Sequence, residues 1–318
     1  MSTFRKTVLT TAIIGAGLAG LTAAYELRST GSARAGEAND LKVDVYEATD
    51  RIGGKLHTVA FEAGPTDMGA EAFLARRHDA VEFIESLGLG DSLVEPSGLH
   101  SLVYSGEIKP LPRGGMMGIP SHSEPVAHLV SAETARRIDN EEPFEWTAGS
   151  DVSVGRLVRQ QFGDDLVDHV ISALLGGVYS CTADDLGVRA TIPQLAQEFD
   201  RLAADGPVHL STAVANLERS RREMPTGQGA VFKTFRDGYQ ELYEALAERS
   251  GADIYIDAFI SAIELEGSKY RLKGGEDKAY DHVILAVPAP TAALLLKEVA
   301  PEASEALKTV KLANSAVV

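Results

Sequence analysis

The chain has 318 residues, of which 44% are hydrophobic and 24% are charged, as is ordinary for a globular protein. This length suits about two domains with cores of their own and excludes a wholly disordered or collagen-like chain. With 30 basic against 46 acidic residues the formal net charge is -16, which disfavours nucleic acid as a partner. The single cysteine, Cys181, can form neither an internal disulfide nor a thiolate metal site. We therefore expect a cytoplasmic protein without a metal site.

The first 47 residues predict a βαβ unit. Residues 8–14 are typical of a short buried strand, and residues 18–28 of the helix that follows it. Residues 41–47 alternate apolar and charged side chains as a second strand does, and the small polar segment 29–40 predicts a surface loop. Strand, glycine-rich turn, helix and strand imply a parallel sheet.

The middle of the chain predicts mainly helices. Residues 78–88, 153–175, 190–205 and 207–222 have helical spacing of apolar residues, whereas residues 96–125 are rich in turn formers and predict loops and short strands. No stretch reaches the ~20 apolar residues of a membrane span, so we expect at most peripheral contact with the inner face of the cell membrane.

Strand signals return near residue 230. We expect strands at 232–235 and 254–256, a helix at 239–249, a hairpin over 260–272 and a buried strand at 282–287. This order, α/β followed by mostly α and again α/β, predicts a nucleotide-binding domain interrupted by an inserted domain.

The motif Gly15-Ala16-Gly17-Leu18-Ala19-Gly20 directly follows the first strand and opens the first helix. In this context G-x-G-x-x-G predicts a dinucleotide site, because its glycines allow a tight turn, close approach of a pyrophosphate and close packing of the helix. The helix N-terminus favours the phosphates, and Glu47, at the end of the second strand, is placed to accept ribose hydroxyls. The alternative is that small residues merely pack the helix on the sheet.

The run Arg51-Ile52-Gly53-Gly54-Lys55 follows at once. Taken alone it is also compatible with a hairpin turn. Together with the glycine motif and Glu47, it resembles the extended fingerprint of FAD enzymes of the glutathione-reductase-like class, a group that includes amine oxidases, carotenoid desaturases and protoporphyrinogen oxidases. The resemblance implies FAD as the cofactor. The residues that it implies for binding FAD are Gly15, Gly17, Leu18, Ala19, Gly20, Glu47, Ala48, Arg51, Gly54, Lys55, Gly69, Ala70, Glu71 and Ile260.

Three further segments narrow the resemblance. Residues 66–73 (TDMGAEAF) resemble the loop that passes the isoalloxazine ring, and residues 111–120 (LPRGGMMGIP) and 174–195 (LLGGVYSCTADDLGVRATIPQL) are similar to segments of bacterial oxygen-dependent porphyrinogen oxidases. That family usually has Gly-Pro where this chain has Gly69-Ala70, and more often glycine where it has Cys181. The family also continues into a second FAD-contacting segment, so we expect the chain to be incomplete at its C-terminus.

The fold class implied is α/β, with a glutathione-reductase-like, Rossmann-type FAD domain interrupted by a mainly helical inserted domain and a β-rich substrate domain. We expect the FAD domain in residues 1–75 and 226–287, the inserted domain in 76–225, and the start of the substrate-domain sheet in 288–318.

The activity implied is oxidation of coproporphyrinogen III to coproporphyrin III in haem biosynthesis, with six electrons passed to O₂ to give hydrogen peroxide. FAD would carry out the redox chemistry, so no acid–base pair is needed. By the same resemblance the Gly177 backbone carbonyl orients a pyrrole N–H, and Arg76 and Arg77, with Arg113 as a further candidate, bind substrate carboxylates. The alternative for these arginines is exposed ion pairing with Glu71 or Asp79. Ferrochelatase, which acts on the next intermediate, is the expected protein partner.

Three other functions stay open from the sequence. Protoporphyrinogen IX is the alternative substrate, and an amine oxidase or desaturase of the same fold is the alternative enzyme. A non-enzymatic alternative is a binding protein resembling the prenyl-binding GDP-dissociation inhibitors, although the intact Glu47 and the run from Arg51 to Lys55 argue against it.

Overall fold

The computed structural model describes residues 8–34, 41–223 and 230–312, which divide into two compact units. The described part of the first unit comprises residues 8–34, 41–97 and 230–312, and that of the second comprises residues 98–223. The first unit therefore extends to Ser97 and includes the segment 76–97, which we had assigned to the inserted domain.

The first unit contains strands from several separate sheets and five α-helices among its described residues. Its strands are β1 (Leu9–Ile14), β2 (Leu41–Tyr46), β3 (Thr58–Phe61), β4 (Gly64–Asp67), β5 (Phe73–Leu74), β6 (Leu93–Val94), β9 (Phe232–Phe235), β10 (Asp253–Tyr255), β11 (Ala262–Glu266), β12 (Lys269–Lys273), β13 (Ala279–Tyr280) and β14 (His282–Leu285). Its helices are α1 (Leu18–Arg34), α2 (His78–Ser86), α10 (Gln240–Ser250), α11 (Ala289–Leu296), α12 (Pro301–Lys308) and the short 3₁₀ helix η1 (Gly90–Ser92).

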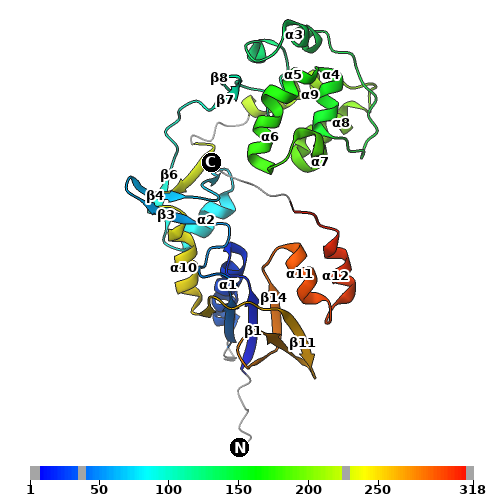
Figure 1. Ribbon diagram of the computed structural model, residues 1–318. Helices are drawn as coiled ribbons and strands as arrows, with labels where there is room; N and C mark the ends of the chain where they lie inside the picture. Colours follow the sequence, from blue (N-terminus) through cyan, green and yellow to red (C-terminus); the bar gives the residue numbers. More distant parts are fainter. Residues whose placement is uncertain (1–7, 35–40, 224–229, 313–318) are drawn as a thin grey trace, which may run out of the picture. The chain divides into compact units, whose positions relative to one another are not determined.

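A parallel, Rossmann-like sheet with the order β10-β2-β1-β14 forms the centre of this unit (Figure 1). Its side chains alternate between two cores, as expected for a sheet covered on both faces. Ile13, Val43 and Val45 pack in one core with residues of α1 and α10, whereas Ala12 and Tyr46 pack in the other with residues of β11, β12 and β13. The pairing of these strands confirms the predicted parallel sheet. The packing on both faces holds the sheet, and with it the loops at its carboxyl edge, in place.

Two predictions about elements of this unit were wrong. Helix α1 continues to Arg34, through the first half of the predicted loop 29–40; residues 35–40 lie outside the described part. A helix that has already formed gains one hydrogen bond per added residue, so weak helix formers can extend it. Helices α11 and α12 occupy the region where we expected a sheet to begin, and Pro290 and Pro301 stand in the first turns of these helices, where proline is tolerated. Residues 313–318 lie outside the described part.

The second unit is mainly helical, as predicted. Its helices are α3 (Ala132–Asp139), α4 (Val154–Gln161), α5 (Asp164–Leu166), the π-helix η3 (Val167–Ile171), α6 (Ser172–Tyr179), α7 (Val188–Thr191), α8 (Pro193–Leu202), α9 (Leu210–Glu223) and the 3₁₀ helices η2 (Glu124–Val126) and η4 (Ala183–Asp185). Its two strands, β7 (Leu102–Ser105) and β8 (Glu107–Pro110), pair as an antiparallel ribbon. The sequence analysis missed α3, although Ser131 accepts a hydrogen bond from the Thr134 N–H as an N-cap residue does.

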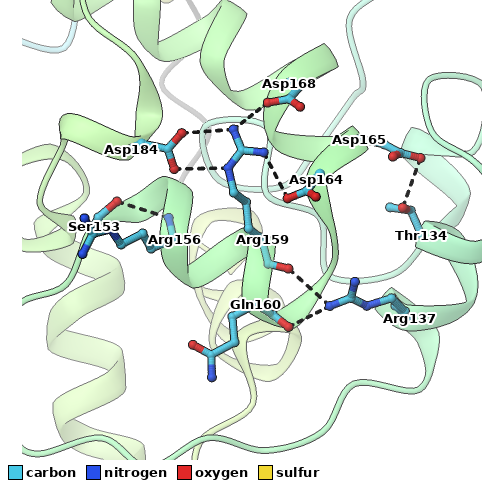
Figure 2. Close-up of polar contacts among 10 residues, drawn as sticks. All are labelled: Thr134, Arg137, Ser153, Arg156, Arg159, Gln160, Asp164, Asp165, Asp168 and Asp184. Atoms are coloured by element: carbon cyan, nitrogen blue, oxygen red, sulfur yellow. Dashed lines mark hydrogen bonds and ion pairs between the residues drawn. The ribbon is translucent and has the colours of Figure 1, made fainter.

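A charged cluster joins the elements on either side of α6 (Figure 2). The Arg159 guanidinium of α4 donates to Asp164 at 3.1 Å, to Asp168 at 2.5 Å and to both carboxylate oxygens of Asp184 at 3.2 and 3.0 Å. Asp168 precedes α6 in η3, and Asp184 follows it in η4. One arginine therefore fixes both ends of the chain segment that contains Gly177.

Candidate functional site

The glycine-rich turn between β1 and α1 is tied to the second strand. The Gly15 N–H donates to the Tyr46 carbonyl at 2.8 Å. A Cβ atom at position 20 would lie 1.9 Å from the Gly15 carbonyl oxygen, so α1 can approach the turn this closely only because residue 20 is glycine. Gly15 and Gly20 therefore serve the packing of the turn itself.

Gly17 is different, because the described part of the chain does not require glycine there. A Cβ atom at position 17 would meet only the Gly54 Cα at 3.7 Å and the Gly53 carbonyl oxygen at 4.0 Å, which are ordinary contacts. The missing side chain thus leaves space in front of the α1 N-terminus, where Leu18 and Ala19 are exposed. Free amides and a favourable helix dipole at that point fit a pyrophosphate.

Glu47 is fixed beside this turn. Its Oε2 accepts the Ala16 N–H at 2.9 Å, and its Oε1 accepts the Thr49 N–H at 3.0 Å and the Thr49 hydroxyl at 2.9 Å. A carboxylate offers about four lone-pair sites, so capacity remains for a ribose hydroxyl. The neighbouring Ala48 is exposed. Turn and carboxylate together fit the nucleotide half of a dinucleotide cofactor.

The run from Arg51 to Lys55 lies against the glycine turn. The Gly53 N–H donates to the Ala16 carbonyl at 2.8 Å. The Arg51 guanidinium donates to the carbonyls of Ile52, Gly54 and Leu56 at 3.2, 2.8 and 3.0 Å, so three of its five N–H groups hold the turn. Lys55 is exposed. Arg51 therefore positions the Gly53-Gly54 backbone, and its charge remains near the proposed phosphate site.

The candidate flavin loop, residues 66–73, is held beside the same run. The Met68 N–H donates to the His57 carbonyl at 2.7 Å, and Gly69 packs so closely that an added Cβ would lie 2.0 Å from the Lys55 carbonyl oxygen. The Glu71 carbonyl accepts the Thr234 hydroxyl at 2.5 Å. Ala70 and Glu71 are exposed. Gly69 therefore packs against the run from Arg51 to Lys55, which itself contacts the glycine turn.

The sequence analysis missed the role of Asp67 in this loop. Its carboxylate accepts the Tyr239 N–H at the start of α10 at 3.1 and 3.2 Å, and the Thr58 hydroxyl at 2.5 Å. Burial, with a smaller effect of the Asp67 charge, raises the pKa of Tyr239 to about 12. Asp67 therefore caps a helix that lies 172 residues away along the chain, and no local sequence signal indicates this.

Ile260 can contribute only its main chain to a ligand. Its side chain is 5% exposed and packs in the core shared by the parallel sheet and β11–β13. Its backbone N–H and C=O have no hydrogen-bond partner among the residues that the structure describes. Both groups therefore remain available to a ligand.

Of the adjacent Arg76 and Arg77, both expected to bind carboxylates, only Arg77 forms an ion pair within the described part of the chain. It donates to both oxygens of Asp79 at 2.9 and 2.6 Å, and both side chains are mostly exposed. The hydrogen bonds from Arg77 hold the pKa of the Asp79 carboxyl at about 2. Arg77 thus forms the exposed pair that was the alternative, whereas Arg76 is exposed without an ion pair to any described residue.

Gly177 lies in the last turn of α6 in the second unit. It is exposed, and a Cβ atom added there would meet nothing within 4 Å. The last carbonyls of a helix lack partners within the helix, so the Gly177 carbonyl can accept a hydrogen bond from a ligand. The neighbouring Gly176 carbonyl accepts the Ser180 N–H at 2.8 Å.

Comparisons with known proteins show which family this chain resembles. A family model described as flavin-containing amine oxidoreductase matches residues 18–318. The coproporphyrinogen III oxidase of Mycobacterium tuberculosis is 37% identical over 310 residues, which cover 96% of this chain and 65% of that protein. A crystal structure from Exiguobacterium sp. 255-15, named as a protoporphyrinogen oxidase, superposes with a TM-score of 0.76 at 27% identity, over 95% of this chain and 64% of that one.

A more distant structure shows the fold alone. Cyclohexylamine oxidase from Brevibacterium oxydans superposes with a TM-score of 0.59 at 18% identity, over 95% of this chain and 63% of that one. In all three cases this chain spans somewhat less than two thirds of the length of the protein that it matches. Within the residues that the structure describes, no helix combines the length and the apolar character needed to cross a bilayer.

Proposed function

The chain belongs to the flavin-containing amine oxidoreductase family, and on this basis we propose that it takes part in FAD-dependent oxidation of coproporphyrinogen III to coproporphyrin III. FAD is the cofactor that membership of this family implies. The observation that carries the choice of substrate is the 37% identity, across 96% of the chain, to a coproporphyrinogen III oxidase. We further propose that the first unit is a glutathione-reductase-like FAD domain and the second unit the helical substrate domain inserted into it.

The residues of the first unit divide the work of holding FAD. Gly17 and the amides at the start of α1 would receive the pyrophosphate, Glu47 would accept the ribose hydroxyls, and the Ile260 backbone would face the adenine. Gly54, Gly69 and Ala70 would contact the flavin half of the cofactor. When bound, FAD supplies the electron acceptor for hydrogen removed from the macrocycle.

The chain's own contribution to the reaction is placement of the substrate. The Gly177 carbonyl would accept a pyrrole N–H, and Arg76 would pair with a substrate carboxylate. Complete oxidation removes six hydrogens, as six electrons and six protons, from the porphyrinogen. Three molecules of O₂ take up two electrons and two protons each and leave as hydrogen peroxide, so the reaction balances without any other oxidant.

We place this reaction in haem biosynthesis and in the cytoplasm, with ferrochelatase as the enzyme that uses the product. The single cysteine is consistent with a reducing compartment. The chemistry supports the order of the steps, because insertion of iron needs the flat, fully conjugated porphyrin that the oxidation produces.

Two measurements test the proposal. The purified chain is first titrated with FAD and the quenching of flavin fluorescence is followed. The FAD-loaded chain is then mixed without oxygen with coproporphyrinogen III, and separately with protoporphyrinogen IX, while the flavin absorbance is recorded. We expect bleaching that is faster with coproporphyrinogen III. Absence of bleaching with either compound by an FAD-loaded chain contradicts the proposal.

Protoporphyrinogen IX is the second candidate, because the Exiguobacterium structure is named as an oxidase of that substrate. The two substrates differ in their number of carboxylates, four in coproporphyrinogen III and two in protoporphyrinogen IX. Faster bleaching by protoporphyrinogen IX would favour this second candidate. Peroxide release from amines, without any reaction of either porphyrinogen, would instead favour an amine oxidase.

A further inference from the structure

The second unit contains a surface cleft of about 500 Å³ that is lined in part by Arg113, the further candidate for binding substrate carboxylates. Three kinds of side chain line it: apolar side chains, a group of nitrogen-bearing side chains and one carboxylate. The lining residues are His100, Pro110, Leu111, Pro112, Arg113, Glu124, Pro125 and His128.

Arg113 is the cation of this cleft, and a histidine ring contacts it. Its Nη2 donates to the Nε2 of His100. No carboxylate of the described residues forms an ion pair with Arg113, in contrast to Arg77 and Arg159. The guanidinium is therefore oriented without losing its charge to a partner, which is the state that a ligand carboxylate needs.

The apolar wall continues onto the β7–β8 ribbon. Leu102 pairs with Pro110 and Tyr104 with Ile108, so these four side chains share one face of the ribbon. That face points to solvent, with Tyr104 76% and Ile108 71% exposed, while Val103 on the opposite face is buried in the helical core. The His128 Nε2 donates to the Pro110 carbonyl at 2.9 Å and so fixes the point where ribbon and cleft meet.

We propose that this cleft binds a carboxylate of an amphipathic tetrapyrrole, with Arg113 as the anchoring cation and the ribbon face against the apolar ring. The inference rests on the proposed function, because a porphyrinogen carries carboxylates that need cationic partners.

Glu124 provides a second test of whether the ligand of the cleft is an anion. It is the one acidic residue lining the cleft, and its carboxylate lies 3.7 Å from the Nε2 of His122, with its side chain 90% exposed. A negative charge there opposes an anionic ligand. Neutralising Glu124 therefore strengthens binding, whereas neutralising Arg113 weakens it.

The test is a fluorescence titration of the whole chain with coproporphyrin III, the stable product, in the absence of FAD. We expect Arg113→Gln to raise the Kd about tenfold, the effect of losing a charge-assisted hydrogen bond, and Glu124→Gln to lower it about twofold. Arg156→Gln, an exposed arginine on α4 that does not line the cleft, leaves the Kd unchanged. The tetramethyl ester of coproporphyrin, which has no carboxylates, binds the wild-type chain and Arg113→Gln equally.

Other outcomes overturn the inference. Equal affinity of wild type and Arg113→Gln for coproporphyrin III removes the cleft as a carboxylate site, and a loss shared with Arg156→Gln indicates a general charge effect. If oleate binds in an Arg113-dependent way and coproporphyrin III does not, the cleft is instead a site for lipid carboxylates. The gain expected for Glu124→Gln cannot arise from misfolding.

The outcome for the cleft and the outcome for the proposed function can be told apart. A chain whose flavin is bleached by coproporphyrinogen III, but whose porphyrin affinity ignores Arg113, keeps the proposed function and loses the cleft. A chain that binds coproporphyrin III through Arg113, but shows no bleaching, keeps the cleft as a porphyrin site and loses the proposed oxidation.

Discussion

Gly17 and Gly20 belong to one motif, yet the structure predicts that their substitution has different consequences. A Cβ at position 20 would lie 1.9 Å from the Gly15 carbonyl oxygen, whereas one at position 17 meets only ordinary contacts. We expect Gly20→Ala to destabilise the folded chain by about 3 kcal/mol, as overpacking does. We expect Gly17→Ala to leave stability within about 0.5 kcal/mol but to weaken FAD binding at least ~10-fold, because the methyl group fills space needed by the pyrophosphate.

Urea denaturation without FAD and flavin-fluorescence titration with FAD measure these two effects separately. Each variant serves as the control for the other. Gly17→Ala binding FAD as tightly as wild type would show that the pyrophosphate does not lie against this turn.

The ion pair of Arg77 and Asp79 has a pH signature. Arg77 donates two hydrogen bonds to the Asp79 carboxyl and holds its pKa at about 2, below the ordinary value. Because the pKa is lowered in the folded state, the pairing contributes stability above the ordinary pKa and loses it as the pH falls from about 4 toward 2. In an NMR titration we expect Arg77→Gln to return the Asp79 pKa toward its ordinary value. Arg76→Gln, at the unpaired neighbour, should leave it unchanged.

For individual residues, the sequence predicted that the glycine turn and Glu47 lie together, but not what each side chain contacts. Spacing alone indicated the glycine turn and Glu47, but the bond from Ala16 to Glu47 joins residues 31 positions apart and depends on the register of β1 and β2. The resemblance implies that Arg51 binds FAD, while its guanidinium donates to three carbonyls. Spacing does not determine the direction in which a long side chain points.

Among the elements, α10 depends on a cap supplied by another part of the chain. Asp67 accepts the Tyr239 N–H, and Thr58 accepts the Gln240 N–H at 2.9 Å, so both residues satisfy donors at the helix start. We expect Asp67→Ala to lower the free energy of unfolding by about 1–2 kcal/mol, as the loss of an N-cap does. Glu248→Ala, at an exposed position on the same helix, should change it by less than about 0.5 kcal/mol.

Urea denaturation followed by circular dichroism measures this difference. Because Asp67 also lies in the loop that holds Gly69, a further consequence is weaker FAD binding by Asp67→Ala. Equal stability of the two variants would mean that water replaces the cap without cost.

Periodicity located most elements but not their limits. The predicted strands at 41–47 and 282–287 correspond to β2 and β14, and the predicted hairpin corresponds to β11 and β12. The wrong predictions fall where the composition of a segment favours one kind of element and its tertiary packing favours another. The apolar run in residues 292–296 is compatible with a strand, but a proline at the first turn and tertiary packing of Leu295 make it helical.

For the whole molecule, the order of elements predicted two bodies more reliably than it predicted their boundary. The change from α/β to mainly α is visible in the periodicity of the sequence, but the first unit includes α2 and β6, which pair or pack with elements more than 100 residues later. Leu93 pairs with Phe235. A contact of that separation leaves no local signal in a single sequence.

The second unit should fold without the first, since one continuous segment supplies its core. The buried residues of this core run from Val103 to Val214 and include Trp146, the only tryptophan of the chain. Trp146 is 8% exposed, its indole N–H donates to Asp200 at 2.8 Å, and Arg189 donates to the same carboxylate. We expect a fragment of residues 98–223 to show blue-shifted tryptophan emission and one cooperative urea transition, at the midpoint that the same fluorescence gives for the whole chain. Asp200→Ala should shift both transitions to lower urea by the same amount, because the carboxylate that it removes lies within this unit. A fragment with the emission of unfolded tryptophan would instead show that the helical unit requires the first unit to fold.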